Sequence, residues 1–250
     1  MSLKIGLNLS RYYSINFDSK KRQKKSIKFI IIHYTGMKNE SAAIQRLCDF
    51  TSKVSAHYFI RNNGEILNLI PDLYRAWHAG SSSWKNFKSL NNHSIGIEIN
   101  NPGHKHGYQK FSLNQIYSLK RLLKHLIKKY DIKIQNILGH SDIAPSRKKD
   151  PGEKFPWNEL AKKKLCIWHN LDKNKLKTFR NNKLSKKKED KFLVNLRKIG
   201  YLKSSRFYSK KNNEYIVKAF QRRFRQGLIN GKIDLECFLI SKNVLSLKNI

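Results

Sequence analysis

The sequence predicts an α/β protein with a mixed central β-sheet flanked by helices, followed by a small C-terminal domain of three helices. Three observations support this prediction. Short β-branched or alternating segments recur between segments of helical periodicity over the first two thirds of the chain. After Trp168 the strand patterns stop and a Lys-rich stretch begins. Three segments with apolar residues at helical spacing then follow.

Four segments read as strands of the sheet. Residues 27 to 33 form a short β-branched run, which is typical of a buried strand. Residues 55 to 61 and 65 to 70 flank Asn62-Asn63-Gly64, whose Asn-Gly pair is a strong hairpin signal. Residues 94 to 100, SIGIEIN, place three isoleucines on one face and small or polar residues on the other. These strands alternate with the predicted helices.

Two helices are expected beside the sheet, at residues 41 to 50 and 113 to 130. The second carries a leucine-rich stripe opposite a basic face, so we expect it to cover the sheet. Beyond the linker, helices are expected at about 185 to 199, 212 to 226 and 234 to 247. The predicted segments are an N-terminal extension (1–26), the α/β domain (27–168), a Lys-rich linker (169–184) and a helical domain (185–250).

The composition is strongly basic. The formal net charge is +35, from 52 basic and 17 acidic residues, which suggests attraction to an anionic polymer. A nucleic-acid-binding protein would interleave basic and stacking aromatic residues in one groove, whereas here Lys is spread along the whole chain, so no specific nucleic-acid partner is expected. The three cysteines, Cys48, Cys166 and Cys237, are widely separated, which argues against a disulfide framework and against thiolate zinc.

Two segments supply candidate metal ligands. The run FIIIHYTG, residues 29 to 36, holds His33 at the end of a predicted strand. Residues 139 to 152, GHSDIAPSRKKDPG, hold His140 and Asp150 ten positions apart. Two neutral imidazoles and one carboxylate leave a fourth coordination position open for water, which is the pattern of catalytic rather than structural zinc. We therefore predict one zinc ion per chain.

Two further polar residues are expected to support the structure and not to bind the metal. Asp142 lies two residues after His140 and is expected to cap the following turn or to brace the site, so it is left out of the ligand set. His57 is expected to be structural or to support a ligand.

Several motifs occur in an order found in one known family. They are HYTG after a strand, VSAHYFIRNNGEI, AWHAG, SIGIEI and GHSDIAPSRKKDPG. Over roughly residues 27 to 165 the chain resembles the zinc N-acetylmuramoyl-L-alanine amidases of the amidase-2 family, which includes the cytoplasmic recycling amidase and is related to the peptidoglycan recognition proteins and T7-type lysozyme. The resemblance implies that family's α/β fold and its cleavage of the bond between N-acetylmuramic acid and L-alanine.

By position in these motifs, the resemblance implies that His33, His140 and Asp150 are the zinc ligands. It implies that Glu98 is the catalytic acid and that Lys148 assists it. The chemistry agrees, because hydrolysis of an unactivated amide needs an activated water, a proton carrier and a cation beside the developing oxyanion.

The resemblance also implies a partner. Trp77 and His78, in AWHAG, match a wall of the substrate groove, so the expected partner is peptidoglycan or a muropeptide. Residues 185 to 250 resemble the three-helix peptidoglycan-binding-like domain of the family's outer-membrane member. We expect the protein to act as a monomer.

Localisation follows from two opposing arguments. The first 26 residues lack the apolar centre of a secretory signal, and no apolar stretch reaches the roughly 20 residues that a transmembrane helix needs. We therefore expect a cytoplasmic protein, and the family resemblance makes the periplasm or outer membrane the alternative.

Two other functions are weaker alternatives. A catalytically inactive peptidoglycan-recognition module usually lacks a zinc ligand, and here all three ligands accompany Glu98 and Lys148. A nucleic-acid-binding protein is suggested by the charge alone.

Overall fold

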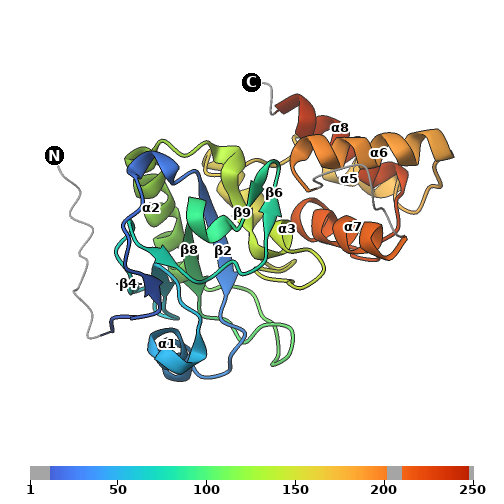
Figure 1. Cartoon of the computed structure of the whole chain (residues 1–250). Helices are drawn as coiled ribbons and strands as arrows, with labels where there is room; N and C mark the ends of the chain where they lie inside the picture. Colours follow the sequence, from blue (N-terminus) through green and yellow to red (C-terminus); the bar gives the residue numbers. More distant parts are fainter. Residues whose placement is uncertain (1–11, 202–209, 248–250) are drawn as a thin grey trace. The chain divides into compact units, whose positions relative to one another are not determined.

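The computed structural model describes residues 12–201 and 210–247 (Figure 1). Contacts divide the chain into two compact units. Unit 1 comprises Met1–Gly80 and Ser89–Gly139, and unit 2 comprises Ser81–Lys88 and His140–Ile250. The chain passes from one unit to the other after Gly80, after Lys88 and after Gly139.

A five-stranded mixed sheet forms the centre of unit 1, in the order β4-β3-β8-β2-β9. Its strands are β2 (Phe29–Tyr34), β3 (Tyr58–Ile60), β4 (Ile66–Asn68), β8 (Ser94–Ile99) and β9 (Ile137–Gly139). Strand β4 is antiparallel to β3, as the predicted hairpin requires, and the other pairs are parallel. Ile30, Ile31 and Ile32 are fully buried, as expected for an inner parallel strand covered on both faces.

Helices α1 (Glu40–Cys48) and α2 (Leu113–Tyr130) accompany this sheet (Figure 1). Helix α1 packs Ile44 and Leu47 against a cluster that includes Phe59 of β3 and Leu67 of β4. Helix α2 buries the predicted leucine-rich stripe, and its start is fixed by a capping box between Ser112 and Gln115. The short 3₁₀ helices of the unit are η1 (Lys24–Ser26), η2 (Phe50–Ser52), η3 (Leu90–His93) and η4 (Ile134–Asn136).

Part of the predicted N-terminal extension belongs to unit 1, and its residues 1–11 lie outside the described residues. Strand β1 (Phe17–Asp18) pairs with β5 (Arg75–Ala76). Ser14 is buried and donates a hydrogen bond to the Leu47 carbonyl (2.6 Å). The described part of this extension is therefore fixed by a side-chain hydrogen bond as well as by strand pairing.

Unit 2 is mainly helical. Its elements are β6 (Ser83–Trp84), β7 (Phe87–Lys88), α3 (His140–Ile143), α4 (Trp157–Lys162), α5 (Lys173–Thr178), α6 (Lys186–Ile199), α7 (Lys210–Phe224) and α8 (Leu235–Ser246). The three predicted C-terminal helices correspond to α6, α7 and α8. Helix α5 lies inside the segment predicted to be a linker. The predicted α/β fold with C-terminal helices is therefore confirmed.

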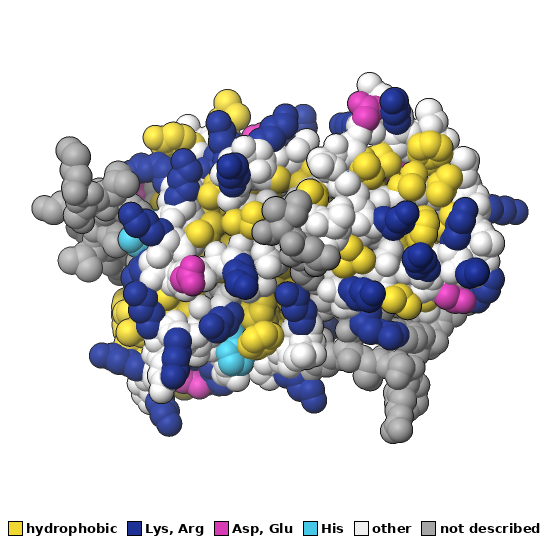
Figure 2. Space-filling model, turned by 90° about the horizontal axis from the view of Figure 1, so that it is seen from above, with side chains coloured by type: hydrophobic (Ala, Val, Ile, Leu, Met, Phe, Trp, Pro, Cys, Tyr) yellow, Lys and Arg dark blue, Asp and Glu magenta, His cyan; other side chains and the backbone are white. Residues whose placement is uncertain are grey.

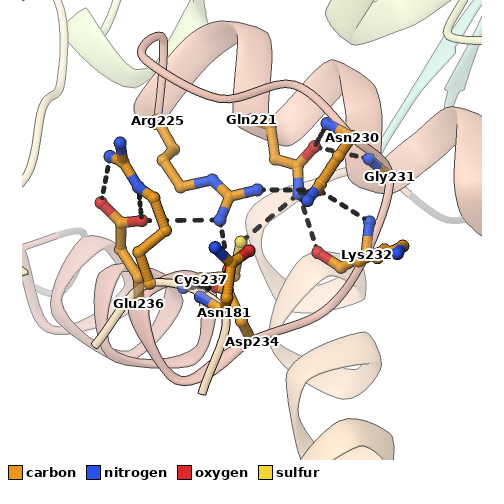
Figure 3. A network of polar contacts seen from close by, with 10 residues as sticks. Asn181, Gln221, Arg225, Asn230, Gly231, Lys232, Asp234, Glu236 and Cys237 are labelled. Carbon is orange, nitrogen blue, oxygen red and sulfur yellow. Dashed lines mark hydrogen bonds and ion pairs between the residues drawn. The ribbon is translucent and has the colours of Figure 1, made fainter. Parts of the chain in front are cut away.

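A polar network fixes the turn between α7 and α8 (Figure 3). The Gln221 amide oxygen accepts hydrogen bonds from the backbone N–H groups of Asn230 and Gly231, and its amide nitrogen donates to the Lys232 carbonyl. The buried Arg225 guanidinium pairs with Asp234 and Glu236. Because each buried charge has an opposite charge beside it, this turn keeps charged groups inside the unit.

Within the described ranges, no helix combines the length and the apolar character needed to cross a bilayer.

Candidate metal centre

Strand register brings the first two site residues together. In the parallel pair of β2 and β8, His33 lies opposite Glu98. In the pair of β2 and β9, Ile32 lies opposite Gly139, and the next residue after Gly139 is His140. The register therefore sets Glu98, His33 and His140 in one row at the carboxyl ends of three neighbouring strands, where ligand sites of parallel sheets occur.

The loop after β9 returns the third residue to this row. The backbone N–H of Ser141 donates to the Asp150 carbonyl at 2.8 Å. The Asp150 Oδ2 atom lies 3.1 Å from Nδ1 of His140. Between them, the backbone N–H groups of Arg147 and Lys148 both bond to the Ala144 carbonyl at 3.0 Å, which closes the loop into a compact turn.

His33, His140 and Asp150 form a group that could hold a metal ion. All three side chains are buried, and their potential ligand atoms lie within 4.8 Å of one another. Burying a carboxylate is unfavourable unless it is paired or bound to a metal. Two imidazoles and one carboxylate are also a donor set that suits a divalent metal. The three ligands predicted from the sequence are thus the residues that the fold brings together.

Two predicted catalytic residues lie near this group in sequence or register. Glu98 is partly buried and is the neighbour of His33 across β2 and β8. Lys148 lies two residues before Asp150 and is also partly exposed. Their catalytic roles remain predictions.

The predicted substrate-wall residues differ in their surroundings. The Trp77 indole N–H donates to Asp18 at 2.7 Å. His78 is only 8% exposed, and its Nδ1 lies 3.1 Å from Nε2 of His33. The contact between these two histidines has no signal in the sequence, because they are 45 positions apart and belong to separate motifs. The role of Trp77 and His78 as a groove wall remains a prediction.

His57 is not one of the three residues that could hold the metal. The Gly96 N–H donates to its Nδ1 at 3.0 Å, and its Nε2 lies 3.0 Å from the Tyr74 carbonyl. Burial, and then the nearby positive charge of Arg22, lowers the pKa of His57 to about 3. The ring is therefore neutral at physiological pH, which agrees with a structural role.

Asp142 is likewise not one of these three residues, and its carboxylate contacts other side chains of unit 2. Tyr201 donates its hydroxyl hydrogen to Oδ1 of Asp142 at 2.7 Å. Arg223 approaches Oδ2 at 3.4 Å, and its guanidinium lies 3.4 Å from the centre of the Trp157 ring. Because Asp142 follows His140 by two residues in α3, these contacts hold the segment that carries one metal ligand.

Comparisons with known proteins point to one family. The family model for N-acetylmuramoyl-L-alanine amidases matches residues 23–153. The N-acetylmuramoyl-L-alanine amidase AmiD of Escherichia coli is 35% identical over 235 residues, which cover 88% of this chain and 82% of AmiD.

Solved structures agree over nearly the whole chain. The E. coli AmiD complex with anhydro-N-acetylmuramic acid-L-Ala-D-γ-Glu-L-Lys superposes with a TM-score of 0.78 at 32% identity, covering 92% of each chain. AmpDh3 of Pseudomonas aeruginosa, in complex with an anhydromuramic pentapeptide, gives a TM-score of 0.78 at 29% identity, covering 99% of each chain. A selenomethionine AmpD structure matches over its full length but covers 67% of this chain, with a TM-score of 0.55 at 29% identity.

Proposed function

The chain belongs to the amidase-2 family of N-acetylmuramoyl-L-alanine amidases, and from this we propose that it uses zinc to hydrolyse the amide bond between N-acetylmuramic acid and L-alanine. The observation that supports the proposal best is the buried group of His33, His140 and Asp150. These residues would hold the ion through two imidazoles and one carboxylate, a donor set typical of catalytic zinc. When bound, zinc supplies Lewis acidity and makes a water molecule nucleophilic at neutral pH.

Glu98 is the proposed proton carrier. It lies beside His33 in the strand register, so its carboxylate belongs to the same row as the ligands. In this role Glu98 takes a proton from the attacking water and delivers it to the departing amine of L-alanine. A carboxylate on a strand whose other residues are all buried is unfavourable, which supports a functional reason for its presence.

Lys148 is the proposed stabiliser of negative charge. Cleavage of the amide makes the lactyl carbonyl oxygen an oxyanion, and a fixed cation nearby lowers the energy of that state. Lys148 precedes Asp150 by two residues, and its backbone N–H bonds to the Ala144 carbonyl in the compact turn of this loop.

The proposed substrates are anhydro-muropeptides, and peptidoglycan itself is the polymeric candidate. Two relatives of known structure were solved with anhydromuramic peptides bound, and both cover more than nine tenths of this chain. The basic surface would add attraction to anionic cell-wall polymers. On the face shown in Figure 2, Lys and Arg side chains are spread widely and some lie side by side, an arrangement that favours general attraction over a groove for one nucleic-acid strand.

The proposal is tested with purified protein and a soluble anhydromuramoyl peptide. Release of the free peptide should stop after removal of metal by a chelator and return on addition of zinc. His33→Ala should abolish both zinc binding and hydrolysis, whereas His125→Ala, which changes an exposed residue on α2, should leave both unchanged. Full hydrolysis by a preparation verified to be free of metal would refute the proposal.

A further inference from the structure

We propose that His78 and Ser94 form a hydrogen-bond chain that fixes the tautomer of His33, so that Nδ1 of His33 is the nitrogen that binds the metal. His78 is then a positioning residue for the metal centre and not part of the wall of a substrate groove. The inference concerns the same metal site and therefore rests on the proposed function. All three residues belong to unit 1.

The Ser94 hydroxyl determines the direction of the hydrogen bonds in this chain. This residue is fully buried, and its hydroxyl donates to the Leu90 carbonyl at 2.6 Å. A serine hydroxyl has one hydrogen and can accept through its oxygen lone pairs. The Ser94 Oγ atom also lies 3.3 Å from Nε2 of His78. Since the only hydrogen of the hydroxyl is directed to Leu90, Ser94 accepts in this second contact, and Nε2 of His78 carries the hydrogen.

The hydrogen on Nε2 of His78 also determines which nitrogen of His33 carries a hydrogen. A neutral imidazole with hydrogen on Nε2 has a lone pair on Nδ1. Nδ1 of His78 therefore accepts from Nε2 of His33, 3.1 Å away. Neutral His33 then carries its hydrogen on Nε2 and presents the lone pair of Nδ1 to the metal. In His140, too, Nδ1 is the ring nitrogen on the side of the predicted ligand set, because it lies 3.1 Å from Oδ2 of Asp150.

The backbone leaves space for this chain at one position. Gly96 lies in β8 two residues before Glu98, on the same face of the strand. A Cβ atom at position 96 would lie 2.4 Å from Cγ of His78, so only glycine lets the ring pack here. The neutral His57 ring packs against His78 edge to face, with ring centres 5.7 Å apart. One face of β8 thus carries both Glu98, the proposed proton carrier, and Gly96, against which the His78 ring packs.

Burial separates this role from a substrate-wall role. His78 is 8% exposed and His33 is 1% exposed. Both ring nitrogens of His78 are directed to protein atoms, Nδ1 to His33 and Nε2 to Ser94. Residues that orient a metal-bound histidine in this way typically change metal affinity or activity about 10–100-fold when they are replaced.

The first test compares zinc affinity, by competition with a chromophoric chelator, in His78→Leu, His78→Asn and the matched control His125→Leu. Leucine removes the acceptor, so zinc affinity should fall about 10–100-fold. Asparagine places its carbonyl oxygen near the position of Nδ1 and should recover most of this loss. His125 is exposed on α2, and its replacement should have no effect. Wild-type affinity in a folded His78→Leu protein would overturn the inference.

The second test does not depend on zinc. In the metal-free wild-type protein, ¹⁵N shifts of the imidazole nitrogens should show hydrogen on Nε2 of both His33 and His78, and addition of zinc should shift Nδ1 of His33. Hydrogen on Nδ1 of His33 would overturn the inference. If the wild type binds no zinc, the proposed function fails, and the metal-free spectrum still decides the tautomer.

Two further variants keep every imidazole. Ser94→Ala removes the acceptor for Nε2 of His78, and Gly96→Ala forces the ring of His78 to move. Both should weaken zinc binding, and in the metal-free spectrum both should show His33 as a mixture of the two tautomers. Unchanged affinity and tautomer in both variants would contradict the proposal, and a circular dichroism spectrum identical to wild type ensures that the comparison concerns folded protein.

Discussion

At the scale of single residues, a variant of Glu98 can distinguish the proposed proton transfer from metal binding. Its neighbour in the register is the ligand His33, yet Glu98 itself is not a member of the metal group. Glu98→Gln keeps the size of the side chain and removes the proton acceptor. Hydrolysis should therefore fall by about 10²–10⁴-fold while the zinc content stays near one ion per chain. A parallel loss of zinc would show that Glu98 is a ligand or a structural residue.

His57 predicts a dependence of stability on pH. Its folded pKa of about 3 lies below the ordinary value of 6.5, so between these pH values only the unfolded chain binds the proton. The free energy of unfolding should therefore decrease as pH falls below 6.5, by about 1.4 kcal/mol per pH unit from this residue.

His57→Asn provides the measurement, because asparagine keeps an acceptor for the Gly96 N–H but does not titrate. Urea unfolding at pH 7, 6 and 5 should give a smaller decrease for His57→Asn than for the wild type. His125→Asn, at an exposed position, should retain the wild-type slope. Equal slopes for all three proteins would mean that His57 is protonated in the native protein.

The individual residues differ in how far the sequence could reveal them. His33, His140 and Asp150 are predictable because their donor chemistry and their local motifs together indicate a metal site. The contact between His78 and His33 is not, because it depends on the packing of a loop against β8 at a glycine. Local motifs indicate which side chains can bind a metal, whereas tertiary packing decides which side chains contact one another.

At the scale of elements, α3 depends on contacts from the helical part of unit 2. Tyr201 and Asp142 are both buried, and the tyrosine hydroxyl is the donor to Oδ1. Tyr201→Phe leaves a buried carboxylate oxygen without this donor, which should destabilise the protein by about 1–3 kcal/mol. Zinc binding should also weaken, since α3 begins with His140.

Thermal unfolding and zinc titration of Tyr201→Phe measure these two effects. Tyr117→Phe is the matched control, because Tyr117 is 63% exposed on α2. A Tyr201→Phe protein with the melting temperature and zinc affinity of the wild type would show that the contact with Asp142 does not support the segment from His140 to Asp150.

The elements themselves are predictable where the signal is local and long. Helix α2 has the predicted bounds because an apolar stripe and a capping box agree on where it begins. Strand β9 and helix α5 are not predicted by the sequence. Strand β9 has three residues and is set by its pairing with β2, and α5 has six residues in a Lys-rich segment with one buried leucine. Short elements of this kind owe their structure to tertiary contacts rather than to periodicity.

At the scale of the whole molecule, the net charge of +35 should govern attachment to polymer. Raising salt from about 0.1 M to 1 M shortens the screening length from about 10 Å to 3 Å. Binding to insoluble peptidoglycan should weaken markedly over this range, because many basic side chains are exposed on the face shown in Figure 2.

Sedimentation of the protein with purified sacculi measures this attachment, and hydrolysis of a small soluble muropeptide in the same buffers is the control. The turnover number on the small substrate should change less than the bound fraction. Attachment that is independent of salt would indicate recognition through uncharged contacts, for instance by the C-terminal helices.

The row of Glu98, His33 and His140 also links the metal to correct assembly of the sheet. A slip of one residue in a strand turns every side chain to the opposite face, so a misregistered sheet has no ligand set to offer. An ion held by these residues would stabilise only the correctly paired chain, by about 4 kcal/mol when free zinc exceeds the dissociation constant 1,000-fold. We therefore expect zinc to protect only correctly paired chains from a protease, because a chain with a shifted strand gains no stability from the metal.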